Sequence, residues 1–240
     1  MRQFKNESFY QVYDRGDQLL LEDMKFENCA FARCAISLTD QFGRMSTVRN
    51  VEALDCLIDV LGHINGPTIF SKVSITNLKT SDLFIIWCPY FDQVTLSGEI
   101  GKMKVNAAAD TSTWGAKNPK QKPFDEFRDQ FYADVEWALD ISKARFKEFD
   151  LRGVPGHLIR RDPESQVLVT RKRALEIARV GWEKQLDQNN KLWPFMINLF
   201  LSDGDEDMVL VAPLGAVKAK RDPLLKGLEE LRRIGLAQPD

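Results

Sequence analysis

Apolar positions between Phe4 and Val105 recur with a period of about twenty-two residues. Within each unit they fall at the first, fourth, sixth and ninth places, with mostly polar residues between them. This spacing does not keep the 3.6-residue period of a helix, and it favours short strands separated by corners. Five copies align on three columns, the last copy one residue early: Phe4, Phe26, Val48, Phe70 and Phe91; Glu7, Cys29, Val51, Val73 and Val94; Phe9, Phe31, Ala53, Ile75 and Leu96.

A repeat of this size predicts stacked strands, because one short strand cannot bury its apolar face alone. Strands stacked about 4.8 Å apart satisfy one another's backbone and place like side chains on like. A polar column suits the corners, where a left-handed conformation is needed; it holds Asn6, Asn28 and Asn50 and continues as Lys72 and Gln93. We therefore predict an N-terminal all-β right-handed parallel β-helix of about five 22-residue coils, followed by a C-terminal α+β domain.

The segment from Phe26 to Ile36, with five-residue steps between Phe26, Phe31 and Ile36, resembles a degenerate pentapeptide repeat. The unit length and the asparagine column resemble the right-handed parallel β-helix of the pectate-lyase type. The resemblance is architectural and covers less than half of the chain. It implies no catalytic motif, because a fold does not by itself carry a function.

The first coil is expected to be an open end of this array. Glu7 occupies an inward column there, so the coil is expected to be partly open, paired or covered by another segment. Exposed strand edges associate readily, which makes a homo-oligomer through the first coil a candidate assembly.

From Phe124 the apolar period changes to steps of three and four residues, which predicts an amphipathic helix extending to Phe149. The composition of residues 111–123 is that of a linker. We therefore expect three parts: a β-helix over 1–110, a linker over 111–123 and an α+β domain over 124–240.

Within the second half we expect a hairpin over 152–170 and a helix over 171–188. Residues 192–201 form either a strand of a second hairpin, with 208–212, or a short helix. A last helix is expected to begin after an N-cap at Asp222, with proline at its first position.

Composition excludes several classes of protein. The chain is 44% hydrophobic and 28% charged, as is ordinary for a globular protein, and its net charge of -2 gives no strong attraction to nucleic acid. The sequence contains no run of eighteen apolar residues, which a membrane-spanning helix would require. The first residues lack the apolar core of a signal peptide. We expect a cytoplasmic protein of bacterial type.

The residues that most often bind metals or catalyse reactions are sparse. Four cysteines lack C-x-x-C spacing, which argues against zinc, and we expect them to be small buried residues, although Cys34 and Cys56 share a column. The acidic run 203–207 lacks the glycine and the glutamate of a calcium loop. His63 and His157 lie in different halves and complete no catalytic set. We therefore expect no metal, no cofactor and no catalytic residue.

Two groups of residues remain as candidate sites. The densest basic cluster is a candidate contact for an acidic partner or a phosphate, although a solvated helix start explains it as well; it holds Arg160, Arg161, Arg171, Lys172 and Arg173. Arg33, Asp55 and Asn77 lie at outward places, with Asp59 and Lys79 nearby. Of these residues, Arg33, Asp55 and Asp59 form an alternative glycan site that would use paired carboxylates.

The sequence favours a non-enzymatic protein that binds another macromolecule, most simply another protein, through a rigid face. A toxin-neutralising or regulatory partner is one form of this function. The alternatives are a glycan-active enzyme and an assembly protein that polymerises through its first coil.

Overall fold

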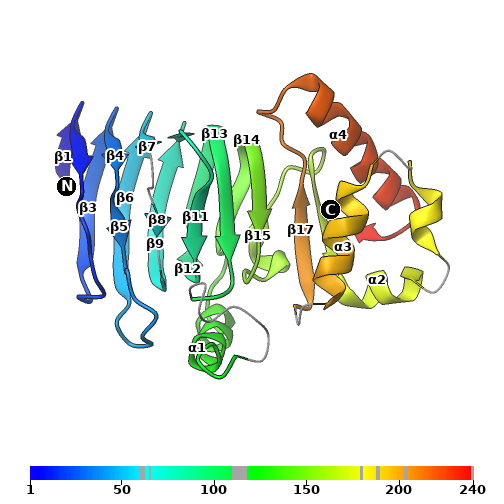
Figure 1. Cartoon of the computed structure of the whole chain (residues 1–240), viewed down its shortest axis with the longest axis horizontal. Helices are drawn as coiled ribbons and strands as arrows, with labels where there is room; N and C mark the ends of the chain where they lie inside the picture. Colours follow the sequence, from blue (N-terminus) through cyan, green and yellow to red (C-terminus); the bar gives the residue numbers. More distant parts are fainter. Residues whose placement is uncertain are drawn as a thin grey trace.

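The computed structural model describes residues 1–59, 63–64, 66–109, 118–178, 181–187, 190–202 and 205–238. Strands stand side by side along the long axis, from β1 at one end, and three of the helices gather at the other end (Figure 1). Helix α1 lies against one side of this array (Figure 1). The chain therefore builds a long stack of strands with helical structure at one end and on one side.

The largest sheet among the described residues has eleven strands, and all its pairings are parallel. The main path is β1-β3-β6-β9-β13-β11-β8-β5, with β12 beside β9, β14 beside β13 and β15 beside β14. The strands are β1 (Arg2–Lys5), β3 (Leu20–Glu27), β5 (Ala35–Ile36), β6 (Ser46–Leu54), β8 (His63–Ile64), β9 (Thr68–Thr76), β11 (Phe84–Trp87), β12 (Pro89–Asp92), β13 (Val94–Asn106), β14 (Leu139–Leu151) and β15 (Ile159–Arg160).

Two smaller sheets and the helices complete the described part of the chain. A parallel sheet of four strands has the order β10-β7-β4-β2, and an antiparallel sheet of three has the order β17-β16-β18. Their strands are β2 (Ser8–Tyr10), β4 (Ala30–Ala32), β7 (Leu57–Asp59), β10 (Lys79–Thr80), β16 (Gln166–Thr170), β17 (Asp207–Val211) and β18 (Ala237–Gln238). The helices are α1 (Lys122–Ala133), α2 (Arg171–Ala178), α3 (Leu192–Ser202) and α4 (Lys218–Arg233), with 3-10 turns η1 (Gly156–Leu158) and η2 (Trp182–Gln185).

The sequence repeat appears as the register of the large sheet, but its step is not constant. Phe4 pairs with Phe26, whereas Phe26 pairs with Ala53, so the second step is five residues longer than the first. Ala53 then pairs with Ile75 at the original step, and Ile75 pairs with Leu96 at a step one residue shorter. The expected column that placed Phe26 over Val48 is therefore wrong, because five additional residues lie between β3 and β6.

The expected fold class, a β-helix of five equal coils, is corrected by the structure. The strand order of the large sheet is open, running from β1 to β5, and is not that of a closed or coiled solenoid. Helix α1 is inserted between β13 and β14, which pair with each other, so the strand region is not all-β. The fold is mixed α/β with a large parallel sheet and, in the described residues, four helices. The resemblance to pentapeptide-repeat and pectate-lyase β-helices therefore does not extend to the fold.

The residues of the predicted asparagine column belong to two columns of left-handed residues, where a single column was expected. Asn6 and Asn28 align with Asp55 and Asn77, all with φ between 54° and 57°, and the column ends at Gly98 with φ of 70°. The other column is a separate set with φ from 53° to 56°; it contains Asp23, Asn50, Lys72 and Gln93. The predicted asparagine column joined these two sets, because an equal step along the chain placed Asn50 after Asn28.

Side-chain amides link neighbouring strands within the first column. The Asn28 amide donates to Asn6 Oδ1 at 2.7 Å, and the Asn77 amide donates to Asp55 Oδ1 at 2.9 Å. Asn77 Oδ1 accepts from the backbone N–H of Glu99 at 3.0 Å. These bonds satisfy groups that a corner would otherwise leave to water. They also align the corners at which β1, β3, β6 and β9 end.

The second half contains fewer local hairpins than expected. The helix predicted from Phe124 to Phe149 ends at Ala133, and the remainder is strand β14, paired with β13. The hairpin predicted over 152–170 is wrong, since β15 pairs with β14 whereas β16 belongs to the three-stranded sheet. Residues 192–202 are helix α3, which confirms the helical alternative. The division into 1–110, 111–123 and 124–240 stays a prediction, and 110–117 lie outside the described residues.

The last helix begins earlier than expected. Helix α4 starts at Lys218, with Val217 in the N-cap position, so Pro223 lies inside the helix and Asp222 is not its cap. A proline there removes one backbone donor. Buried Leu224, Leu228 and Leu231 hold the helix against the three-stranded sheet and α3.

The three-stranded sheet covers the β14 end of the large sheet. The Gln166 side chain donates to the Ile141 carbonyl at 2.9 Å, and the Gly215 N–H donates to the Phe146 carbonyl at 2.8 Å. Leu168 and Val209 belong to the same apolar cluster as the large sheet. This end of the strand stack is therefore buried, whereas the β1 end is not.

We predict that Asn77→Ala lowers the free energy of unfolding by about 2 kcal/mol. The substitution removes two hydrogen bonds and leaves a Cβ-bearing residue at positive φ without its amide. Asn77→Gly is the matched control: it loses the same bonds but tolerates positive φ, so it is expected to cost about 1 kcal/mol less. Urea titration measures both. Equal losses for the two variants contradict the conformational part of this explanation.

Candidate functional site

The predicted basic cluster is divided among separate structural contacts. The guanidinium of Arg171 donates to the carbonyls of Asp205 at 2.6 Å, Leu201 at 3.1 Å and Phe200 at 2.9 Å. These carbonyls lie at and just beyond the C-terminal end of α3, where they lack helical partners. Arg171 therefore holds the end of α3 and the segment that leads into β17.

The other members of the cluster have different surroundings. Arg160 lies over the Trp137 ring at 4.1 Å, and Arg173 donates to the Gly235 carbonyl at 3.3 Å. Arg161 is partly buried, and Lys172 is exposed on α2. Their proposed contact with an acidic partner stays a prediction, but Arg160, Arg171 and Arg173 already have contacts within the chain.

The alternative glycan residues lie beside the four-stranded sheet. Asp55 is a left-handed corner residue, and its carboxylate accepts the hydrogen bond from Asn77. Asp59 ends β7, and Arg33 is a left-handed residue whose guanidinium lies 6.0 Å from the Tyr10 ring. Asp55 therefore has a structural role, and the use of these residues on a glycan stays a prediction.

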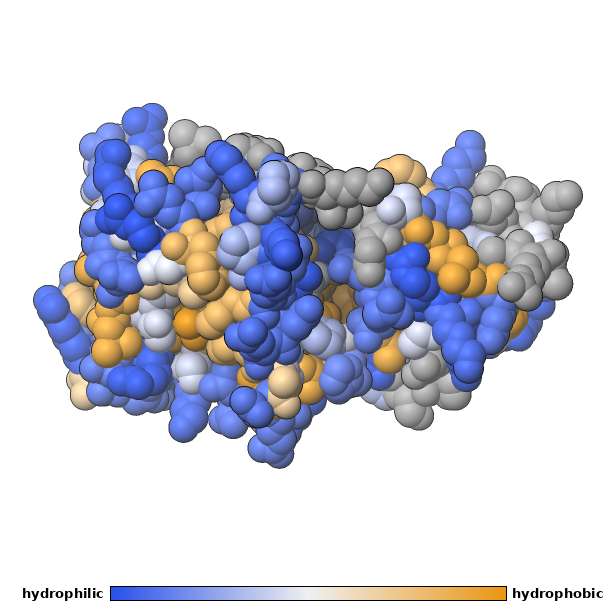
Figure 2. Space-filling view, turned by 90° about the horizontal axis from the view of Figure 1, so that it is seen from below, coloured by the Kyte–Doolittle hydropathy of each residue, from blue (hydrophilic) through white to orange (hydrophobic). Residues whose placement is uncertain are grey.

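A cavity of about 660 Å³ lies between α1, the segment after β14 and the start of β17. Seen from below, the molecule is hollowed between α1 and the helical end (Figure 2). Three segments far apart in the sequence contribute its walls. The lining residues are Arg128, Asp129, Tyr132, Ala133, Gly153, Val154, Pro155, His157, Asp205, Glu206 and Asp207.

Two glycines allow the segment after β14, which forms the floor of the cavity, to pack closely against neighbouring residues. Gly153 has φ of 78°, and a Cβ there would lie 2.8 Å from the Cβ of Ala107. A Cβ on Gly156 would lie 2.2 Å from Leu168, so only glycine permits this approach. The Gly156 N–H consequently reaches Asp207 Oδ1 at 2.8 Å. This bond joins the segment after β14 to the start of β17.

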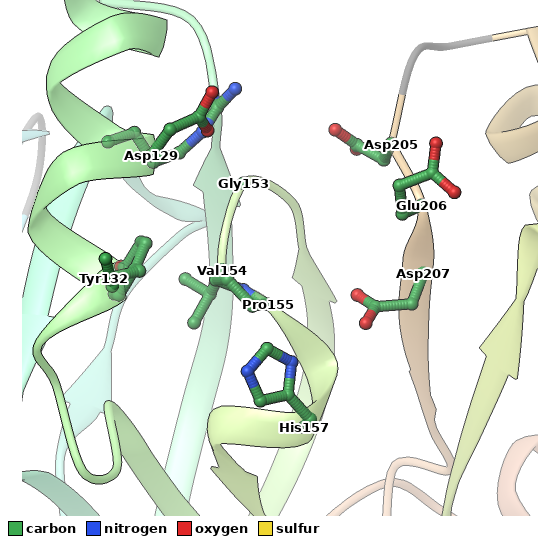
Figure 3. A pocket seen from close by; sticks show the side chains of 11 residues that line it. Asp129, Tyr132, Gly153, Val154, Pro155, His157, Asp205, Glu206 and Asp207 are labelled. Atoms are coloured by element: carbon green, nitrogen blue, oxygen red, sulfur yellow. The ribbon is translucent and has the colours of Figure 1, made fainter.

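Carboxylates dominate the charge of the cavity. Asp205 and Asp207 point from one wall towards the other two segments, and Asp129 comes from α1 (Figure 3). With Glu206 they make four carboxylates among the described lining residues, against one guanidinium, Arg128, which is ion-paired with Asp125 at 3.0 Å. A concave site with one sign of charge concentrates ions of the other sign. The cavity is therefore suited to a cation.

Asp207 is the carboxylate of the cavity whose pKa responds most clearly to burial. Burial raises its pKa, and this effect outweighs the hydrogen bond from Gly156 and the charges of His157 and Arg161, which lower it. His157 lies opposite Asp207 on the floor of the cavity (Figure 3). Because burial disfavours the charged form of Asp207, a cation supplied by a ligand would stabilise that form.

Tyr132 closes the cavity on the side of the large sheet. Its hydroxyl accepts from the backbone N–H of Phe91 at 3.2 Å, and burial raises its pKa. The phenol therefore stays neutral and acts as part of the wall. Tyr90, which is also buried, donates from its hydroxyl to the Phe124 carbonyl at 3.1 Å and helps to hold α1 in place.

No known protein family, characterised protein or solved structure matches the chain. The assignment of the site consequently depends on its geometry alone. In the part of the chain that the structure describes, no group of three or more His, Cys, Asp or Glu side chains is arranged to hold a metal ion. No helix of this part is long and apolar enough to cross a lipid bilayer.

The four cysteines are free thiols. Cys29, Cys56 and Cys88 are buried, and burial raises the pKa of Cys88 to about 11. Cys56 aligns with Cys29 across the neighbouring strands rather than with Cys34. The column predicted for Cys34 and Cys56 is wrong for the same reason as that of Phe26.

The cavity was not predicted from the sequence. The acidic run 203–207 was considered as a calcium loop, whose features it lacks. Asp205, Glu206 and Asp207 line the cavity, while 203–204 lie outside the described residues. The density of acidic residues was the available signal. The sequence did not indicate that α1 and His157 lie opposite these acidic residues.

We predict that Arg171→Ala lowers the free energy of unfolding by about 2 to 3 kcal/mol, because three carbonyls lose a charged donor. The neighbouring exposed substitution Lys172→Ala is the control and is expected to change stability by less than about 0.5 kcal/mol. Thermal and urea unfolding measure the difference. Unchanged stability of the Arg171→Ala variant would contradict this structural role, and Arg171 would again be a candidate for binding a partner.

We predict that Asp207→Asn is more stable than the native chain at neutral pH. A raised folded-state pKa means that the carboxyl contributes stability below its unfolded value of 3.8 and loses it as pH rises through the folded value. Asparagine carries no charge and keeps an oxygen to accept from Gly156. The stability difference should therefore disappear in acid.

Urea titrations at neutral pH and below pH 3.8 test this prediction, with exposed Glu229→Gln as control. A variant that is less stable at neutral pH shows instead that His157 and Arg161 fully compensate the Asp207 charge.

Proposed function

We propose that the chain is a non-catalytic protein-binding module whose acidic cavity receives a lysine or arginine side chain of another protein. The observation that carries this proposal is that four carboxylates line one cavity, that Asp205 and Asp207 point into it (Figure 3), and that the one guanidinium among the described lining residues is already ion-paired. A volume of about 660 Å³ is ample for one long basic side chain and part of its backbone. Arginine fits best, because its planar fork pairs with carboxylates in bidentate geometry.

An exposed apolar stripe on α3 supports a macromolecular ligand over a small one. Leu192, Phe195 and Leu199 follow one face of the helix and are 40%, 61% and 42% exposed. Hydrophobic side chains are visible on the helical end beside the hollow (Figure 2). A partner that places a basic residue in the cavity and apolar residues on this stripe would combine an anchor with an apolar contact.

The lining gives less support to catalysis. Its described residues include acid–base groups, His157 and the carboxylates, but no serine, threonine, cysteine or lysine. The hydroxyl among them belongs to Tyr132 and is bonded to the backbone. Neutralisation or regulation of the bound protein is the role that we propose for the contact. The free thiols fit a reducing compartment, and we place this role in the cytoplasm.

A displayed library of random peptides tests the function although the natural partner is unidentified. We expect the full chain to select sequences with lysine or arginine beside apolar residues. The variant Asp205→Asn, Glu206→Gln, Asp207→Asn is expected to bind the selected peptides at least about tenfold more weakly, a loss of about 1.4 kcal/mol. Salt should weaken native binding, since exposed charges are screened.

The matched control removes three exposed carboxylates elsewhere: Glu164→Gln, Glu176→Gln and Glu229→Gln. Both triple variants carry the same net charge, so a general charge effect weakens them equally and contradicts the proposal. Absence of any selected peptide, together with turnover on a panel of polysaccharides, would replace it with the glycan-active alternative.

A further inference from the structure

The β1 end of the molecule exposes an unusual share of its apolar side chains. Thirteen large hydrophobic side chains are exposed among the described residues, and six of them lie in the first twenty residues. We call these six the N-terminal edge surface: Met1, Tyr10, Val12, Tyr13, Leu19 and Leu20, which are 40% to 60% exposed. Concentration of apolar residues at one end marks an interaction surface.

The backbone at this end is also available for pairing. Strand β1 is the edge of the large sheet, and β2 is the edge of the four-stranded sheet. The N–H groups of Asn6 and Gln11 donate inwards, to Glu27 and Ala32. Since successive N–H groups of a strand alternate in direction, those of Lys5 and Tyr10 point outwards. Within the described residues no strand pairs with this outer side.

The inner neighbours show what fits this surface. Phe4 stacks on Phe26 with centroids 5.0 Å apart, and Phe9 stacks on Phe31 at 5.1 Å, with ring planes within 9° of parallel. Phe9 also contacts Phe26 edge to face, with ring centroids 5.9 Å apart, so rings at these two positions pack on each other across neighbouring strands as well as on their own kind. The outer side of Phe4 and Phe9 presents this same pair, so a second copy of the chain carries the matching surface.

The charges of the first twenty residues also permit self-association. Three cations, Arg2, Lys5 and Arg15, are balanced by three carboxylates, Glu7, Asp14 and Asp17. Two such surfaces carry no net charge that would keep them apart. The other end of the strand stack is covered by the three-stranded sheet, so copies cannot add from head to tail.

We propose that two copies of the chain pair through their N-terminal edge surfaces in a closed two-fold dimer. Strand β1 of one copy lies antiparallel to β2 of the other, which sets Phe4 opposite Phe9 twice. This arrangement separates Arg2 and Lys5 of one copy from the same cations of the other. The contact is isologous and leaves the acidic cavity of each copy open, so it is independent of the proposed peptide binding.

Sedimentation equilibrium of the full chain tests the dimer. At roughly 100 µM, where a micromolar dimer is fully formed, we expect twice the chain mass of 27.5 kDa. Tyr10→Glu with Val12→Glu places carboxylates in the contact and is expected to raise the dissociation constant at least about a hundredfold. The control, Leu175→Glu with Val217→Glu, alters residues at the helical end that are 49% and 74% exposed, against 60% and 55% for Tyr10 and Val12, and should remain dimeric.

Circular dichroism and thermal unfolding verify that both variants are folded, and a Tyr10→Phe variant that remains dimeric separates the contact from the phenol hydroxyl. A native chain that is monomeric at this concentration overturns the proposal and leaves the edge to a segment of a different protein. A dimer that persists in the Tyr10 and Val12 variant, or that is lost equally in the control, overturns it as well.

Discussion

The parallel pairing of strands that carry left-handed residues at their ends is the constraint on which the rest of the structure depends. Asn6, Asn28, Asp55 and Asn77 turn the backbone at aligned positions, and their side chains form two hydrogen-bonded pairs, Asn28 with Asn6 and Asn77 with Asp55. Parallel sheets occur almost only where both of their faces are covered. Each strand is thereby fixed in register by the one before it, and rings such as Phe4 and Phe26 stack as a result.

The local part of this pattern could be predicted from the sequence, whereas the register could not. Phe4 does pair with Phe26 and Ala53 with Ile75, as the apolar columns indicated. Five additional residues between β3 and β6 change the step once, and a period fitted to the whole segment cannot reveal a single change of step. The same limit applies to β14, because the spacing of Phe127 and Phe131 on a helix continues without a break into a strand.

The site required knowledge of which segments meet. Asp205 to Asp207 are conspicuous in the sequence, but their chemistry depends on α1 and on the Gly153 to His157 segment, which come from far earlier in the chain. The basic cluster shows the converse. Arg171 is close in sequence to other cations, yet its guanidinium is used on carbonyls at the end of α3. Charge density in a sequence locates ionisable groups without telling which of them already have partners.

Helix α1 is inserted between β13 and β14, so it contributes a wall of the cavity without interrupting the large sheet. Those strands remain paired along their length although the chain leaves the sheet between them. The helix can therefore vary in sequence or length while the framework on which it rests keeps its register. Related chains with the same sheet would therefore diverge first in α1. Such changes would alter which partner side chains the cavity accepts, while the fold stays the same.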